Sequence, residues 1–328
     1  MIKLNFQTKT LLASFVITVV LGIIIVPILR KMKIGQIERS DGPESHLKKQ
    51  GTPTMGGIII MLGIIIVTIL AYMYYRSIEP QTAHNLIPIL FLTMGFGAIG
   101  LIDDFKKLVL KDTKGLKPSL KMLGLLLISV IYVLYLIKGV NIGTDTYIPI
   151  LKEYVNIPIY AYIPFAILVI LGTTNAVNLT DGIDGLSSTV SAIIITCLTI
   201  IATILGVKEI VIFGAITIGA VLAFLMFNIY PAKAFMGDTG SLFLGGVISG
   251  VALYLKMPLI LLVIAIIPVI ETISVIIQVA CFKKTGKRVF KMAPIHHHLE
   301  LSGWRENQVV MLFGIITLVV CIIGLQII

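Results

Sequence analysis

Residues 11–33 read LLASFVITVVLGIIIVPILRKMK, and this stretch decides the class of fold. It holds 19 uncharged residues, which are followed by Arg30, Lys31 and Lys33. A helix needs about 20 apolar residues to cross the hydrocarbon core of a bilayer. The run is too long for a signal peptide, lacks a small-residue cleavage site, and has the basic flank of a stop-transfer signal. The stretch therefore predicts a first transmembrane helix that stays in the protein.

Long uncharged runs of this kind recur along all 328 residues. Hydrophobic residues make up 57% of the chain and charged residues only 13%, whereas soluble domains have about 45–50% and about 25%. This composition excludes an ordinary soluble globule. We predict an all-α polytopic membrane protein, with a single integral-membrane domain over 1–328 and about ten transmembrane helices at 11–29, 56–75, 86–102, 120–139, 160–177, 187–206, 209–227, 239–255, 257–281 and 308–328.

The charges divide unequally between the two sides that these spans define. One side carries 19 of the 26 basic residues, so the positive-inside rule makes it cytoplasmic and turns both termini outward. The net charge of +10 is then explained by cytoplasmic loops and anionic partners, and does not indicate nucleic acid. Twelve of the 16 acidic residues also lie on this face or, for Glu271, within a span. We therefore expect the active site on the cytoplasmic face.

The third span ends in GFGAIGLIDDFKK, which places Asp103 and Asp104 where the helix leaves the hydrocarbon. Adjacent carboxylates repel each other unless a cation lies beside them. Magnesium fits such a pair, because it takes oxygen ligands from one or two carboxylates and from substrate phosphates. The alternative is a pair of solvated acids balanced by Lys106 and Lys107.

Two further loops on this face carry acids beside glycines. The first reads NAVNLTDGIDGLSS over residues 175–188 and contains Asn178, Asp181 and Asp184. It is either part of a site or a tight inter-helix turn with Asp184 near the N-terminal cap of the next helix.

The second of these loops reads NIYPAKAFMGDTGSLFLGG over residues 228–246 and contains Asn228. It places Asp238 at the start of a predicted helix. There Asp238 either meets a phosphate-bound metal or serves as a simple N-cap. Phe235 either stacks on a base or is an ordinary interface aromatic.

Two last loops add cations. Residues 296–298 are three consecutive histidines, which favour contacts with pyrophosphate over a zinc site because no HExxH or CxxC spacing accompanies them. Lys48 and Lys49 precede a Gly-Thr-Pro turn that suits anions. Acids, amides, lysines and histidines on one face together indicate magnesium-assisted chemistry on a phosphate at the bilayer surface.

The ninth span contains Pro268 followed by Glu271. Proline inside a long helix removes a hydrogen bond and bends the helix. The bend either opens a groove for a long lipid chain or is an ordinary kink at which Glu271 satisfies the freed backbone groups.

An ion-coupled transporter is the rival class of function, but transporters bind their substrates near the midplane of the membrane and are built from repeats. The acids here lie at one interface, and the sequence shows no repeat.

The strings SHLKKQGTPTMGG, GLIDDFKK, NAVNLTDGIDGL, PAKAFMGDTGSL and KMAPIHHHLE resemble, in order and spacing, the polyprenyl-phosphate N-acetylhexosamine-phosphate transferase superfamily. Within it the chain is most similar to the phospho-N-acetylmuramoyl-pentapeptide transferase family. The resemblance implies a magnesium-dependent enzyme of the bacterial plasma membrane that is frequently a homodimer. It implies UDP-N-acetylmuramoyl-pentapeptide as donor, undecaprenyl phosphate as acceptor, UMP as leaving product, and the first lipid-linked intermediate of peptidoglycan synthesis. The alternative enzyme is the relative that transfers N-acetylglucosamine phosphate.

The resemblance also implies roles for individual residues. It makes Asp103, Asp104 and Asp238 the catalytic and metal-binding acids, with Asp238 as the direct magnesium ligand. It makes His296 the catalytic or pyrophosphate-binding histidine. The remaining implied substrate contacts are Lys49, Lys121, Asn178, Asp181, Asp184, Asn228, Phe235 and His297.

Overall fold

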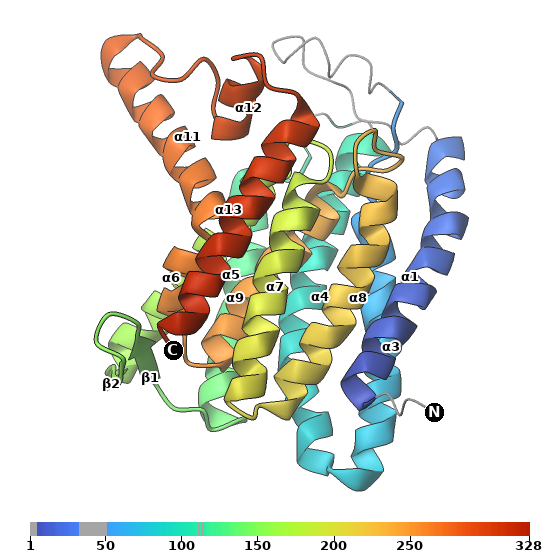
Figure 1. Cartoon of the computed structure of the whole chain (residues 1–328), viewed down its shortest axis with the longest axis vertical. Coiled ribbons are helices and arrows are strands. Elements are labelled where there is room, and N and C mark those ends of the chain that lie inside the picture. Colours follow the sequence, from blue (N-terminus) through green and yellow to red (C-terminus); the bar gives the residue numbers. More distant parts are fainter. Residues whose placement is uncertain (1–4, 33–50, 111, 113–114) are drawn as a thin grey trace.

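A computed structural model describes residues 5–32, 51–110, 112 and 115–328 (Figure 1). Within these ranges, nine helices are long and apolar enough to cross a membrane. They are α1 (Phe6–Lys31), α3 (Gly57–Ile78), α4 (Pro80–Leu108), α5 (Pro118–Lys138), α6 (Ile159–Thr180), α7 (Leu186–Ile204), α8 (Lys208–Asn228), α11 (Ile266–Thr285) and α13 (Glu306–Gln326). The chain is thus a polytopic helical protein, as predicted.

The remaining predicted span, 239–255, forms α9 (Gly237–Tyr254), which is not one of these nine. It packs against α3, α4, α6 and α7, and every residue from Thr239 to Tyr254 is buried. Glycines of α9 let neighbouring helices approach its backbone closely, as small residues allow in membrane bundles: a Cβ at Gly245 would overlap the backbone of Thr174 in α6, and one at Gly240 would crowd the backbone of Gly57 in α3. The prediction of about ten similar spans therefore missed that one helix is the core of the bundle.

The ninth predicted span is interrupted, but not where Pro268 lies. It consists of η1 (Pro258–Ile260), the short α10 (Leu261–Ile264) and α11, which begins at Ile266. Pro268 falls in the first turn of α11, where backbone N–H groups lack helical partners in any case. A proline ring clashes with the carbonyl four residues earlier, and that residue is Ile264, the last of α10. The break therefore precedes the proline.

Two strands lie outside the all-α prediction. A hairpin of β1 (Asp145–Ile148) and β2 (Glu153–Asn156) occupies the loop before α6, with Asp145 opposite Asn156. Tyr147 fastens it, because its N–H donates to Lys256 O and its hydroxyl to Ile327 O. The histidine run forms the short helix α12 (Ile295–Glu300) at the other end of the bundle.

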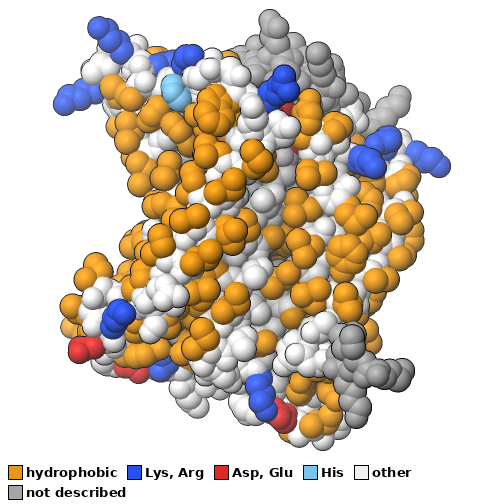
Figure 2. All heavy atoms as spheres, viewed as in Figure 1, with side chains coloured by type: hydrophobic (Ala, Val, Ile, Leu, Met, Phe, Trp, Pro, Cys, Tyr) orange, Lys and Arg blue, Asp and Glu red, His pale blue; other side chains and the backbone are white. Residues whose placement is uncertain are grey.

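The start of α1 and the end of α13 lie at the opposite end of the bundle from the polar loops (Figure 1). Phe6, at the start of α1, stacks on Tyr74 near the end of α3, with ring centroids 4.7 Å apart. The end of α13 lies near the hairpin, since the Tyr147 hydroxyl donates to Ile327 O. The loops after α4, α6, α8 and α11 meet at the other end. There α11 leans away from the bundle, and the surface below it is hollowed and apolar (Figure 2).

Candidate active site

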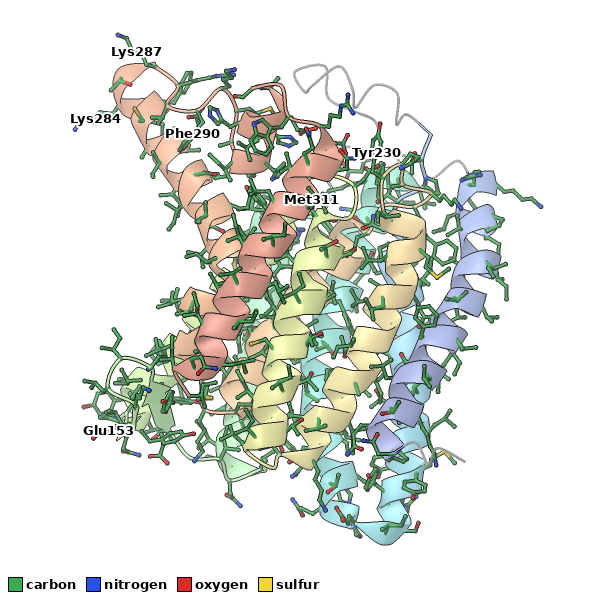
Figure 3. The ribbon with its side chains drawn as sticks, in the orientation of Figure 1. Glu153, Tyr230, Lys284, Lys287, Phe290 and Met311 are labelled. Atoms are coloured by element: carbon green, nitrogen blue, oxygen red, sulfur yellow. The ribbon has the colours of Figure 1, made fainter. Side chains whose placement is uncertain are left out.

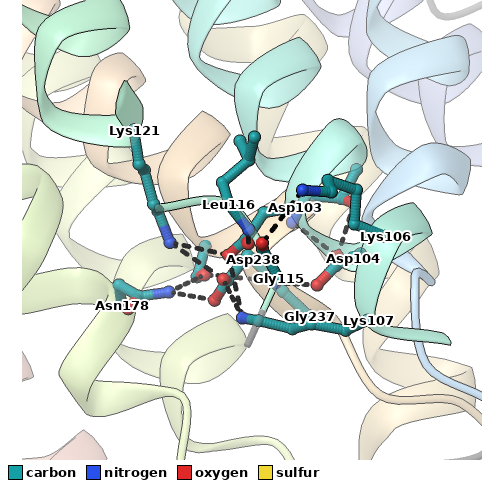
Figure 4. Close-up of polar contacts among 12 residues, drawn as sticks. Asp103, Asp104, Lys106, Lys107, Gly115, Leu116, Lys121, Asn178, Gly237 and Asp238 are labelled. Carbon is teal, nitrogen blue, oxygen red and sulfur yellow. Dashed lines mark hydrogen bonds and ion pairs between the residues drawn. The ribbon is translucent and has the colours of Figure 1, made fainter. Parts of the chain in front are cut away.

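Two carboxylates and two ammonium groups meet where α4, α5 and α9 come together (Figure 4). Asp103 is near the end of α4, and Asp238 is in the first turn of α9. Lys107 Nζ lies 2.8 Å from Asp103 Oδ2 and 2.9 Å from Asp238 Oδ2. Lys121 Nζ, from the first turn of α5, lies 3.2 Å and 2.8 Å from the same two oxygens. We call these four residues the carboxylate–lysine cluster.

The second oxygens of both aspartates are also held. Asp103 Oδ1 accepts a hydrogen bond of 2.7 Å from the backbone N–H of Leu116. Asp238 Oδ1 accepts one of 2.8 Å from Asn178 Nδ2, which lies in the last turn of α6 and also donates to Ser241 Oγ. The side chain of Asp238 therefore joins four helices and does not cap α9, whose N-cap residue is Met236. The interpretation of Asp238 as a simple N-cap is wrong.

Asp104, the neighbour of Asp103, faces a different partner. It is buried, and its carboxylate accepts hydrogen bonds from the N-terminus of α9: Asp238 N at 3.2 Å, Thr239 N at 2.9 Å and Thr239 Oγ1 at 2.6 Å. The two helices touch at this point, because a Cβ at Gly100 would overlap the carbonyl of Asp238.

Asp181 follows α6 and borders the same region. Burial raises the pKa of its carboxyl to about 8, the negative charges of Asp238 and Asp104 add to the rise, and a hydrogen bond from Gly237 N–H opposes it. Negative charge is therefore crowded here even with two lysines present. A further cation would favour the ionised form of Asp181.

Asp184 and Asn228 form a second group, which holds the loop between α8 and α9. Asp184 Oδ2 accepts a hydrogen bond of 2.9 Å from Ala232 N. Asn228 donates to Ala234 O at 3.0 Å and accepts from Ser188 Oγ at 2.7 Å. The N-cap residue of α7 is Gly185, without a side-chain hydrogen bond. Asp184 therefore lies beside this cap, as the tight-turn interpretation expects, while its carboxylate holds Ala232.

Phe235 lies in the loop that this second group holds. Its N–H donates to Pro53 O and its carbonyl accepts from Gly56 N, both at 2.8 Å. The backbone is thus tied to the segment before α3, while the side chain stays partly exposed.

The histidines have separate partners. His296 is fully buried, with Nδ1 3.0 Å from Glu271 Oε1, and its ring tip rests on Gly182, where a Cβ would overlap Nε2. His297 Nδ1 lies 2.9 Å from Glu300 Oε2. Glu271 therefore binds a histidine, and the interpretation that it serves only the backbone at the kink is wrong.

The structure brings together six of the residues that the sequence singled out: Asp103, Asp104, Lys121, Asn178, Asp181 and Asp238. His296 adjoins them only through the turn at Gly182. Lys49 lies outside the described residues. In the described part of the chain, no three Asp, Glu, His or Cys side chains are placed to hold a metal ion by themselves.

Lys107 is a site residue that the sequence indicates only as a counter-charge for a solvated pair of acids. Its spacing of four residues from Asp103 places both on one helical face, and this signal could have identified it. Thr239 was missed as well, since nothing in the sequence indicates that a helix elsewhere donates to Asp104.

Comparisons with known proteins match nearly the whole chain. The profile of Glycosyl transferase family 4 matches residues 86–256, and Phospho-N-acetylmuramoyl-pentapeptide-transferase signature 1 matches residues 49–61. Relatives named phospho-N-acetylmuramoyl-pentapeptide-transferase include one from Clostridium botulinum (strain Alaska E43 / Type E3), 49% identical over 96% of this chain and 94% of the relative. Others are from Clostridium perfringens (strain 13 / Type A), 49% identical over 95% of both chains, and Acetivibrio thermocellus, 47% identical over 95% of this chain and 92% of the relative. The chain therefore belongs to the phospho-N-acetylmuramoyl-pentapeptide transferase family.

Proposed function

We propose that the protein transfers phospho-N-acetylmuramoyl-pentapeptide from its UDP-linked donor to undecaprenyl phosphate. An oxygen of the lipid phosphate attacks the phosphorus nearest the sugar, and UMP leaves. The product is the first lipid-linked intermediate of peptidoglycan synthesis. The observation that carries the proposal is the carboxylate–lysine cluster at one end of a bundle of membrane helices, since phosphoryl transfer depends mainly on positioning and charge stabilisation.

The two lysines supply positive charge where phosphates would bind. Lys107 and Lys121 each lie between two carboxylates, so their ammonium groups are held in place before substrate arrives. A phosphate oxygen that takes the place of one carboxylate oxygen at a lysine leaves that carboxylate with the other lysine, and the negative charge that it brings needs a further cation. Such preorganised groups lower the barrier because they need little rearrangement during reaction.

The donor atoms of the site also fit magnesium. Magnesium usually takes one or two protein carboxylates together with substrate phosphates, so a complete protein cage is not required. We propose Asp238 as the direct ligand with Asp103 beside it, since one oxygen of each carboxylate lies beside the same two lysines. When bound, the ion would supply charge neutralisation for the pyrophosphate.

Asp103 could serve as a general base or as a positioning group. A phosphate monoester has a second pKa near 6, so about nine-tenths of the lipid phosphate is already dianionic at pH 7. Because Asp103 accepts hydrogen bonds from Lys107, Lys121 and Leu116, we infer that it positions the metal and the attacking oxygen.

For Asp103→Asn we therefore expect a deficit in kcat, relative to the parent, that stays nearly constant between about pH 6 and 9. A base that only ionises the acceptor would become dispensable as the acceptor ionises itself. The measurement is the pH profile of UMP release for both proteins. A marked recovery of the variant at alkaline pH would restore the base assignment.

The donor is proposed to lie over the loops after α6 and α8, with contacts from Asn178, Asp181, Asp184, Asn228 and Phe235. Lys49 and His297 are proposed to complete this pocket, and His296 to bind pyrophosphate or to act in catalysis. Phe235 suits a stacking role, because its backbone is held by Pro53 and Gly56 while its ring is partly exposed.

Phe235→Ala should raise the donor KM by about tenfold or more, because stacking on a base is worth roughly 1–3 kcal/mol. The acceptor KM should change little. Phe105→Ala is the matched control. Phe105 is an exposed aromatic in the last turn of α4, at the same end of the bundle as Phe235. Equal effects of the two changes on the donor KM would make Phe235 an ordinary interface aromatic.

The polar end of the bundle is proposed to face the cytoplasm of a bacterial cell, with both termini outward and the whole chain as one transferase domain. Lys284 and Lys287 at the tip of α11 lie at this end, and Glu153 lies at the other (Figure 3). Helix α11 borders the hollow apolar surface (Figures 1 and 2). Its exposed apolar residues include Ile273, Ile276 and Phe282, and such a surface suits the prenyl chain. A homodimer is proposed from the family alone.

The test uses purified protein with magnesium, undecaprenyl phosphate and one of two donors. Release of UMP from UDP-N-acetylmuramoyl-pentapeptide but not from UDP-N-acetylglucosamine is expected. The reverse preference would place the protein with the N-acetylglucosamine-phosphate transferases. Substrate uptake into liposomes without UMP release would make it a transporter.

A further inference from the structure

The N-terminus of α9 lacks a cap of its own. The first backbone N–H groups of any helix have no helical partner, and the N-cap residue Met236 offers α9 no side-chain acceptor. Water has little access, because Met236 and Thr239 are fully buried. An acceptor from elsewhere in the protein is therefore needed, since an unsatisfied buried N–H is costly.

Asp104 on α4 supplies this acceptor. Both of its oxygens are engaged: Oδ1 with Asp238 N at 3.2 Å, and Oδ2 with Thr239 N at 2.9 Å and Thr239 Oγ1 at 2.6 Å. The residue is 5% exposed, and its carboxylate lies at the positive end of α9, where a negative charge is favoured. The contact thus resembles an N-cap made by a residue of another helix.

The neighbouring aspartate points elsewhere. Successive residues on a helix are about 100° apart, and Asp103 accordingly accepts from Lys107, Lys121 and Leu116, whereas the donors to Asp104 are Asp238 N and the Thr239 N–H and hydroxyl. The Asp-Asp pair therefore serves two helix faces. One acid belongs to the carboxylate–lysine cluster, and the other holds the backbone that carries Asp238.

We propose that Asp104 is a positioning residue that caps α9 from α4 and thereby fixes the Asp238 carboxylate, and that it is not a magnesium ligand. This inference rests on the proposed function and changes one part of it, because the sequence resemblance placed Asp104 among the metal-binding acids. The two roles have opposite consequences in a metal-free protein. Removing a cap destabilises the fold, whereas removing an idle ligand relieves repulsion between carboxylates.

The first experiment measures thermal unfolding of the full chain in detergent with EDTA. Asp104→Ala is expected to lower Tm by about 2–4 °C or more, from the usual effect of losing a cap. Glu153→Gln is the control, since Glu153 is an exposed acid at the other end of the molecule, and it should leave Tm unchanged. An unchanged or raised Tm for Asp104→Ala would overturn the proposal.

The second experiment couples Asp104 to its partner and also covers the case in which Asp104→Ala does not fold. Thr239→Val removes only the hydroxyl donor, and Asp104→Asn keeps an acceptor oxygen. If the two residues act through one contact, the Tm loss of the double variant is smaller than the sum of the single losses. Fully additive losses would contradict the cap.

The third experiment uses Mn²⁺ alone as the probe, titrated into substrate-free protein and followed by electron paramagnetic resonance. Asp104→Asn is expected to bind Mn²⁺ within about a hundredfold of the parent affinity, because losing a residue that only orients a ligand costs about 10–100-fold, and a greater loss would make Asp104 a ligand. A parent protein that binds no Mn²⁺ would count against the metal proposal, while the EDTA measurements would still decide the role of Asp104.

Discussion

Asp238→Asn is expected to lower kcat by about 10²–10³-fold, the range found when one preorganised electrostatic group is removed from an active site. The variant keeps the size of the side chain but loses the charge that Lys107 and Lys121 share. Its amide would also place an N–H group against one of the present donors, either a lysine or Asn178. The measurement is single-turnover UMP release at saturating donor, acceptor and magnesium.

The matched control for this change is Glu153→Gln, which likewise turns a carboxylate into an amide, at an exposed position on β2. It should leave kcat unchanged, and both proteins should give the same monodisperse profile in detergent. If Asp238→Asn kept a tenth or more of the parent kcat under these conditions, the carboxylate–lysine cluster would not be the catalytic centre.

Gly100→Ala is expected to have the second large effect. A Cβ at Gly100 would overlap the carbonyl of Asp238 and press on Thr239 N. These are backbone atoms at the start of α9 and cannot rotate away as a side chain can. We expect a loss of stability of about 1–3 kcal/mol, typical of overpacking. Turnover should also slow by about 10²-fold or more, because a displacement of about 1 Å near the chemistry can cost that much.

Gly172→Ala provides the comparison for this change. Gly172 is also helical, in α6, but nothing lies within 4 Å of the position that its Cβ would take. Alanine there should be neutral or stabilising by up to about 1 kcal/mol, since alanine favours helix more than glycine does. The measurements are Tm in detergent and the turnover rate for both variants. A harmless Gly100→Ala would show that α4 and α9 can separate without loss of function.

The positions of the helices could be predicted because each span is an uncharged run, and the runs at 56–75 and 160–177 became α3 and α6 with shifts of a few residues. The hairpin could not, because two four-residue strands leave little signal. The position of the break before α11 was also missed. The prediction centred the bend on Pro268, whereas the ring acts on the carbonyl of Ile264, four residues earlier.

For the site, the sequence located the acids but did not indicate which residues each acid contacts. Asp103 and Asp238 are 135 positions apart, and only the packing of α4 against α9 brings them to the same lysines. The different partners of Asp103 and Asp104 depend on which face of α4 meets α9. A pattern of residues gives the periodicity of a helix, but not the neighbour on each face.

The enclosed position of α9 has a consequence for biogenesis. A segment rich in glycine and serine, with Asp238 in its first turn, gains little by entering lipid alone, because insertion depends on the summed apolarity of the segment. Its partners α4 and α6 precede it in the chain and are synthesised first. We expect the ribosome-bound chain to retain α9 beside the translocon until these earlier helices receive it, so its integration depends on helix–helix recognition more than on hydrophobicity.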